Sequence, residues 1–304
     1  MPVPAGGVTE DTVTSVLPSV STVVESLPQK TQRRHGELRE KHCMVLVDAN
    51  PDISVQEREY KRLLGFPPDH EPGERARELM DWARTWYREN GKPWVYARSA
   101  KEIALNDGQV RIERETFSSK RLRHQLVHVE GESAILVAVS AGGELEEQAR
   151  QLWEEGKPDE YFFLEIFGSA LVEHLITFAA FRFCEWGDRE GVAILPHDSP
   201  GYPGWEISEQ SRLLDILRGE NEIPGKLQAL ESGMLRPKKS LLGVFGVTRN
   251  VAQVQRLTAL IPCQSCSHQS CQYRRVPSKK SLPRLEDLGR YQRPIILQGN
   301  RKPQ

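Results

Sequence analysis

The feature that most constrains the fold is a long apolar run between Tyr161 and Phe183. A membrane-spanning helix needs about 20 apolar residues, so this run has the length of a span. Ionisable residues interrupt it, namely Glu165, Glu173 and His174. Charges near the middle of a span are costly, and the sequence contains no second run of this kind. We therefore expect a helix over about 159–186 that is buried in a soluble domain, and no membrane association.

A buried helix of this length needs a large core around it. The chain has 304 residues, of which 38% are hydrophobic, enough for one large domain or two ordinary ones. Lys and Arg total 41 against 42 for Asp and Glu, and this balance argues against a nucleic-acid-binding function. The balance is uneven along the chain, because residues 272–304 hold nine basic and two acidic residues. That tail carries +7 and the remainder −8, so the tail either docks on an acidic surface or is solvated.

Hydrophobic periodicity predicts further helices and strands on either side of the long helix. Helices are expected over 71–90, 144–155, 208–217 and 250–260. Strands are expected over 94–97, 133–140, 191–195 and 240–247. We expect Trp153 and Phe162 to lie on the inner faces of their helices. The strand over 133–140 is followed by Gly142 and Gly143 and then by a helix. This order suits either a phosphate cradle or a tight connection, and the absence of a full glycine fingerprint favours the connection.

These patterns divide the chain into three parts. Residues 1–41 are predicted to be a flexible leader, 42–260 the folded domain, and 261–304 a cysteine cluster with a basic tail. The chain has five cysteines and no signal peptide at its start, so we expect a cytoplasmic, reducing location rather than a disulfide framework.

A loop rich in proline and glycine is the best candidate for a ligand site. It runs from Ser199 to Trp205, and its two prolines and two glycines fix one backbone path. The aromatic rings of Tyr202 and Trp205 could stack on a planar ligand. By contrast, four basic residues before the central strand are expected to be surface charges, namely Arg121, Arg123, His124 and His128. No Ser-His-Asp pattern or paired carboxylates support a hydrolase.

The loop and two other segments resemble the activation domain of cobalamin-dependent methionine synthase. The loop with its preceding residues, 197–202, is similar to that family's Pro-Gly-Tyr loop. The block 231–240 is similar to its Glu-Ser segment, proline and glycine strand, and 168–173 to its long helix. The resemblance spans about residues 50–260. His197 stands where the family has an arginine, and a family tyrosine beyond the glycine strand has no clear counterpart after Val247.

The resemblance implies an α+β fold, with a single mixed domain built on a twisted, mainly antiparallel sheet and flanking helices. It also implies an accessory component of a methyltransferase that binds S-adenosylmethionine. Such a protein meets a cobalamin-binding domain of a methionine synthase or another corrinoid protein, and reactivates its cobalamin in trans. The electron comes from a flavodoxin-like or ferredoxin-like donor. The implied S-adenosylmethionine site comprises five residues: Glu173, His197, Ser199, Gly201 and Tyr202.

A cysteine cluster near the end of the chain predicts a metal site. Three thiols and one imidazole fall within nine residues: Cys263, Cys266, His268 and Cys271. An iron–sulfur cluster, zinc, or no metal are all compatible with this spacing, and Cys43 or Cys184 could complete a site. The cluster, together with His197 in place of arginine, leaves an alternative function open. In that alternative, the protein is a metal-containing electron-transfer or binding partner of a corrinoid protein that does not use S-adenosylmethionine.

Overall fold

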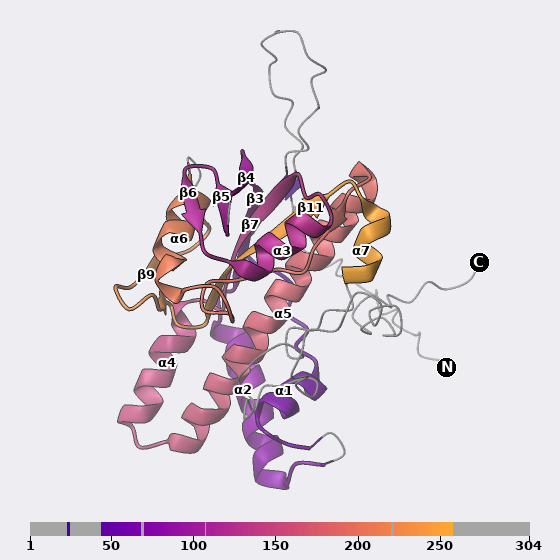
Figure 1. The fold of residues 1–304 in the computed structure, drawn as a ribbon. Coiled ribbons are helices and arrows are strands. Elements are labelled where there is room, and N and C mark those ends of the chain that lie inside the picture. Colours follow the sequence, from indigo (N-terminus) through magenta and orange to yellow (C-terminus); the bar gives the residue numbers. More distant parts are fainter. Residues whose placement is uncertain (1–22, 25–43, 68–69, 107, 220–221, 258–304) are drawn as a thin grey trace, which may run out of the picture.

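An antiparallel sheet of six strands lies at the centre of the protein (Figure 1). The computed structural model describes residues 23–24, 44–67, 70–106, 108–219 and 222–257. The strand order is β1-β2-β3-β7-β11-β8. The strands are β1 (Val23–Val24), β2 (Val45–Asp48), β3 (Trp94–Ser99), β7 (Ser133–Ser140), β11 (Ser240–Thr248) and β8 (Ala193–Ile194). The α+β class expected from the sequence is confirmed.

Strand β7 is buried on both faces and paired along both edges. It runs antiparallel to β3 and to β11, with Ser140 opposite Ser240 and Ser133 opposite Val247. Because side chains alternate across a strand, Ile135 and Val137 enter one hydrophobic core, while Leu136 enters a second core on the opposite face. The sheet therefore separates two cores.

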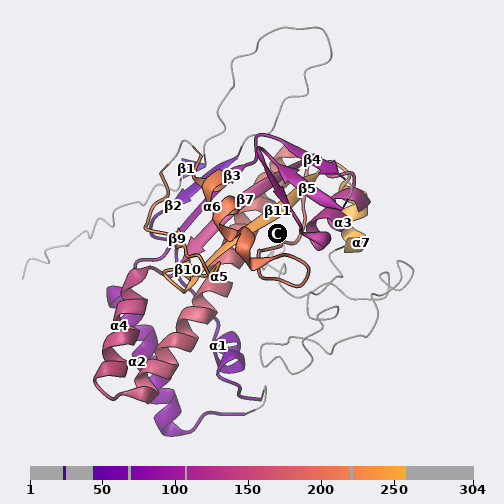
Figure 2. The same ribbon diagram turned by 60° about the vertical axis from the view of Figure 1, so that its left-hand side comes forward.

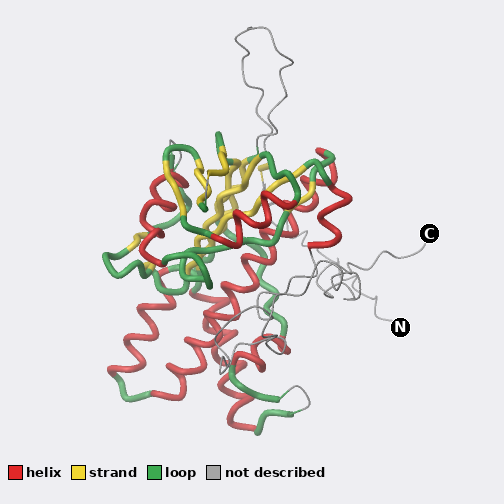
Figure 3. Tube along the Cα trace, in the orientation of Figure 1, coloured by secondary structure: helices red, strands yellow, loops and turns green. Residues whose placement is uncertain are grey.

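Four helices contribute buried residues to the first core. They are α1 (Glu57–Leu63), α2 (Glu74–Asn90), α4 (Gly143–Glu154) and α5 (Pro158–Glu190). Helix α5 contacts the other three helices and strands β3, β7 and β11. In Figures 1 and 3 the lower half of the molecule consists of α1, α2, α4 and the first part of α5, and the strands lie in the upper half.

Helix α5 is the long apolar helix predicted from the sequence. It is long and apolar enough to cross a membrane by length and composition alone. Its buried residues, among them Leu164, Phe167, Leu171 and Phe183, instead pack into the first core against strands and neighbouring helices. This packing supports its interpretation as the core helix of a folded domain.

The second face carries shorter elements around the second core (Figure 2). They are a small sheet of β4 (Ile103–Asn106), β5 (Gln109–Ile112) and β6 (Glu115–Phe117), then α3 (Lys120–His128), α6 (Gln210–Arg218), the pair β9 (Gln228–Ala229) and β10 (Leu235–Arg236), and α7 (Val251–Leu257). A 3-10 turn over Ile207–Glu209 precedes α6. Ser119 caps α3, because its hydroxyl accepts a hydrogen bond from the Leu122 amide.

Two orientation predictions are wrong. Trp153 is 62% exposed and Phe162 is 46% exposed, although both were expected to face the core. The Trp153 ring lies against Tyr161, with ring centroids 5.2 Å apart, across the turn from α4 to α5. The helical pattern itself is right, since Leu145 and Leu152 of α4 are buried. The large aromatic residues occupy the border of the apolar stripe rather than its centre.

The predicted leader and tail lie mostly outside the described residues. Within the leader, Val23 and Val24 form β1, which pairs with β2 at the edge of the sheet. The segment 261–304, with the whole cysteine cluster, is outside the described residues.

The turn between β7 and α4 depends on glycine. Gly142 has a φ of +86°, and a Cβ atom there would lie 2.6 Å from the Lys92 carbonyl oxygen. Gly156 has a φ of +70°, and a Cβ atom there would have no other atom within 4 Å. Substitution of Gly156 therefore tests the effect of backbone strain alone. We expect Gly142→Ala to lower the free energy of unfolding by about 2–4 kcal/mol, and Gly156→Ala by about 1 kcal/mol. Urea unfolding measures both, and equal losses would contradict the close approach of Lys92.

Candidate functional site

The proline- and glycine-rich loop begins as an extension of the sheet edge. After β8 the chain continues beside β11, with the Leu195 amide donating to the Gly246 carbonyl over 2.8 Å. Asp198 and Val244 then exchange two backbone hydrogen bonds, of 3.0 and 2.9 Å. From Ser199 the chain turns away, and the Gly201 amide donates to the Trp205 carbonyl over 2.9 Å. Gly201 has a φ of +91°, which a residue with a side chain rarely adopts.

The loop brings two of the predicted site residues together. The Nε2 atom of His197 lies 3.2 Å from the Tyr202 hydroxyl oxygen, and both side chains are half-buried. The His197 ring also packs on Phe245 of β11, with centroids 5.3 Å apart. Phe183 of α5 also contacts Phe245, edge-on, with ring centroids 5.0 Å apart. An imidazole and a phenol therefore stand side by side, with the imidazole on the apolar support of Phe245.

Phe245 is a contact that the sequence analysis missed. The strand over 240–247 was predicted, and its single aromatic residue lies between Val244 and Gly246. One aromatic ring between two glycines, in a strand that is otherwise aliphatic, is a signal that could have identified it.

Ser199 contributes a buried hydroxyl to the same face of the sheet. Its side chain is 3% exposed, and its Oγ atom has no hydrogen-bond partner among the described residues. A Cβ atom at Gly243 would lie 3.3 Å from this Oγ, so the glycine leaves room beside the hydroxyl. A buried polar group without a partner costs about 1–3 kcal/mol, which is a reason to look for a ligand or water there.

Asp198 points to the opposite face and anchors the loop to α3. The Ser119 hydroxyl donates to the Asp198 carboxylate over 2.5 Å, and the carboxylate is fully buried. The Arg121 guanidinium lies 3.8 Å away. Burial raises the pKa of Asp198 above its ordinary range, although the Ser119 hydroxyl and the Arg121 charge oppose the rise. Arg121 was expected to be a surface charge; that expectation is wrong, because it faces this buried carboxylate.

A second carboxylate anchors the far end of the loop. Glu209 accepts hydrogen bonds from the Ser118 amide over 3.0 Å and from the Trp205 indole over 2.8 Å. The Arg212 guanidinium lies 2.9 Å from the same side chain. Trp205 is 3% exposed, so it belongs to the second core, and of the two rings proposed for stacking only Tyr202 is accessible.

The predicted acidic residue of the long helix, Glu173, lies on α5 and is half-buried. Another acid on α5 is clamped by lysines: Glu165 lies 2.6 Å from the Lys238 amine and 3.1 Å from the Lys239 amine. The lysines come from the segment between β10 and β11, so these ion pairs join α5 to that segment.

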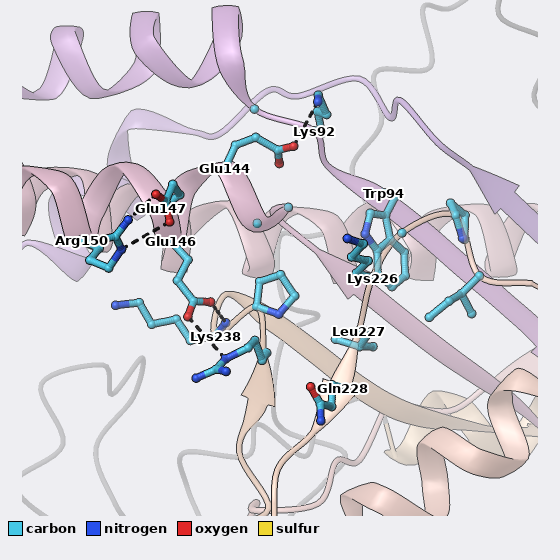
Figure 4. Close-up of a pocket in the computed structure, with 18 of the residues that line it drawn as sticks. Lys92, Trp94, Glu144, Glu146, Glu147, Arg150, Lys226, Leu227, Gln228 and Lys238 are labelled. Carbon is cyan, nitrogen blue, oxygen red and sulfur yellow. Dashed lines mark hydrogen bonds and ion pairs between the residues drawn. The ribbon is translucent and has the colours of Figure 1, made fainter.

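A broad groove of about 1750 Å³ opens at the other end of β11 (Figure 4). It lies between the start of α4, the start of β3 and the segment 223–228. None of the five predicted S-adenosylmethionine residues lines it. Its carboxylates face cations: Glu144 lies 3.2 Å from the Lys92 amine, and Glu146 lies 4.0 Å from the Arg236 guanidinium. Glu146 also accepts a hydrogen bond from the backbone amide of Lys238 over 2.9 Å.

The residues around the groove also distinguish the two interpretations of Gly142 and Gly143, a phosphate cradle or a tight connection. Glu144 and Glu146 lie in the first turn of α4, where a bound phosphate would meet two like charges. Gly142 meets the Lys92 backbone closely. Both observations favour a tight connection over a phosphate cradle, in line with the preferred sequence interpretation.

The predicted metal ligands Cys263, Cys266, His268 and Cys271 lie outside the described residues, as does Cys43. Cys184 lies half-buried on α5, and burial raises the pKa of its thiol. Within the described part of the chain, no three His, Cys, Asp or Glu side chains are grouped so that they could hold a metal ion.

Among solved structures, the crystal structure of the MetH reactivation domain bound to AdoHcy is similar to this chain, with a TM-score of 0.46 and 16% sequence identity. The match covers 59% of this chain and 67% of that chain. No family model and no curated protein matches the sequence.

The raised pKa of Asp198 predicts how stability depends on pH. An acid whose pKa is higher in the fold than in the unfolded chain loses stabilising free energy as it ionises. We therefore expect the free energy of unfolding of the wild type, relative to Asp198→Asn, to fall as the pH rises from about 4. Asparagine still accepts a bond from Ser119 and does not ionise. Urea unfolding over a pH series tests this, and a relative stability that rises with pH would show that the carboxylate is stabilised in its charged form.

Proposed function

We propose that this protein binds S-adenosylmethionine at the loop over 197–205 and reactivates a cobalamin-dependent methionine synthase, or a related corrinoid protein, in trans. One observation carries the proposal. The loop that resembles the family's binding motif brings His197 and Tyr202 to 3.2 Å from each other, and it also carries the buried hydroxyl of Ser199, which has no hydrogen-bond partner among the described residues. These three polar groups are of the kind that orient a small zwitterionic ligand on a largely apolar support.

The reaction assigned to the partner's cobalamin balances with one electron and one methyl group. An electron donor reduces inactive Co(II) to Co(I), which takes the methyl group from the sulfonium and leaves S-adenosylhomocysteine. The contribution of this protein is to hold the sulfonium donor in one orientation and to bring it to the metal. An accessory role of this kind requires no general acid or base of its own.

Each loop residue has a role that its chemistry fits. His197 faces the ligand's carboxylate, and Tyr202 offers a hydroxyl and a half-exposed ring. Ser199 supplies a hydrogen bond from its hydroxyl or its backbone. Gly201 permits the left-handed turn that sets Tyr202 beside His197. Glu173 is assigned to the ligand's ammonium group, because a carboxylate is the natural partner of that charge.

The alternative is a metal-containing partner of a corrinoid protein that does not use S-adenosylmethionine. The observation in its favour is His197 itself. A neutral imidazole makes one hydrogen bond to a carboxylate, whereas the arginine of the related family makes two and carries a charge. A folded protein that carries metal and has no S-adenosylmethionine affinity would favour this alternative.

Titration calorimetry with S-adenosylmethionine tests the proposal. We expect saturable binding by the wild type. Tyr202→Ala should weaken it at least about tenfold, because it removes both the ring and the hydroxyl beside His197. His197→Arg should tighten binding about tenfold, since a bidentate charged pair replaces a single bond.

Lys226→Ala is the matched control for these variants. Lys226 lies in the groove at the other end of β11, is exposed, and makes no polar contact among the described residues. We expect its affinity to equal that of the wild type. Binding that is lost in Lys226→Ala and kept in Tyr202→Ala would move the ligand to the groove. No binding by the folded wild type would overturn the proposal.

A further inference from the structure

Helix α3 carries two histidines one turn apart on its surface. His124 and His128 are four residues apart, and residues at this spacing are neighbours on one face of a helix. Their ring centroids lie 5.8 Å apart, with an angle of 21° between the ring planes. His124 is exposed and His128 is half-buried. Apart from this mutual contact, neither ring has a hydrogen-bond partner within the part of the chain that the structure describes.

Two imidazoles at this spacing form the simplest chelating pair available on a helix. A neutral imidazole is the commonest metal ligand in proteins, and metalloproteases use histidines at i and i+4 on one helix face to bind zinc. A metal–nitrogen bond is about 2.1 Å long, so two rings on one ion have centroids within about 6.4 Å of each other. The observed 5.8 Å falls inside this limit.

The basic neighbours of the pair are directed elsewhere, which lowers the repulsion that a bound cation would meet. Arg123 donates from Nε to the Asn106 carbonyl over 3.1 Å. Arg121 faces the buried carboxylate of Asp198. Lys120 packs its side chain beside Gly204.

We propose that His124 and His128 form a binding site for a divalent transition-metal ion of the nickel, copper and zinc group. One nitrogen of each imidazole is a ligand, and water fills the remaining positions. Nitrogen ligands of this kind suit these metals, and the affinity order should be copper above nickel and zinc. Its two ligands are different residues from those proposed for S-adenosylmethionine and from those of the cysteine cluster. A metal that joins i and i+4 also holds the last turns of α3 closed, so binding should stabilise the fold.

Nickel titration with variants of the full-length chain tests the proposal. The background variant carries Cys263→Ser, Cys266→Ser and Cys271→Ser, so that thiolates do not compete for the metal. In this background we expect one nickel ion to bind and to raise the Tm. His124→Ala and His128→Ala should each weaken binding at least about tenfold, because a single imidazole is left.

His70→Ala is the matched control, since His70 is an exposed histidine that stacks on Phe66, away from α3. It should leave nickel binding unchanged. The same test is repeated in the chain with its cysteines intact, in case the variant with three serines folds poorly. There, His124→Ala should lower the number of bound nickel ions by one. Pulsed EPR of bound copper should show two imidazoles. Unchanged nickel binding in both His→Ala variants, or an EPR signal from one imidazole, would overturn the proposal.

Discussion

The pairing of β7 with β3 on one edge and β11 on the other is the constraint on which the rest of the structure depends. Ladder hydrogen bonds satisfy the backbone of β7 on both sides, and its side chains enter a separate core on each face. Helix α5 packs along one face of the sheet, because Val137 and Phe245 present an apolar surface to it. The opposite face is left for α3 and α6. The outer edge of β11 then receives β8 and the start of the loop, which fixes the position of the candidate site.

The loop is held from both of its ends by buried carboxylates. Asp198 binds the cap residue of α3, and Glu209 binds the adjacent Ser118 amide and the Trp205 indole. Asp198 and Glu209 bind the adjacent residues Ser119 and Ser118 at the start of α3, so both ends of the loop are fixed to that helix. Rigid support of this kind lowers the entropy lost when a ligand binds. Burial of Asp198 makes its ionisation unfavourable, which costs stability at neutral pH. In return, the carboxylate fixes the geometry of the loop.

Much of the central architecture could be predicted from the sequence because it depends on local patterns. The strand over Ser133–Ser140 is a continuous apolar run that ends before two glycines, and the structure has the same bounds. The apolar run in α5 predicts a long helix, and the ionisable residues within it favour a core helix over a membrane span. Helix α3 was missed, although Ser119 followed by Leu122 and Leu126 is a cap and an apolar stripe that could have identified it.

The remaining features depend on contacts between distant segments. Asp198 and Ser119 are 79 residues apart, and nothing in either local sequence indicates that the Ser119 hydroxyl donates a hydrogen bond to Asp198. The same holds for the two lysines that clamp Glu165 and for the ring of Phe245 beneath His197. Loop residues were therefore found by their resemblance to a family motif, while their supports became visible only in the fold.

Hydrogen–deuterium exchange with and without S-adenosylmethionine tests the central claim most directly, because it reports where a ligand acts without any substitution. Binding at the loop predicts slower exchange of backbone amides over 199–205 and in neighbouring β11, with the start of α4 and the segment 223–228 unchanged. Protection confined to the groove segments, or no protection anywhere at saturating ligand, would contradict the account.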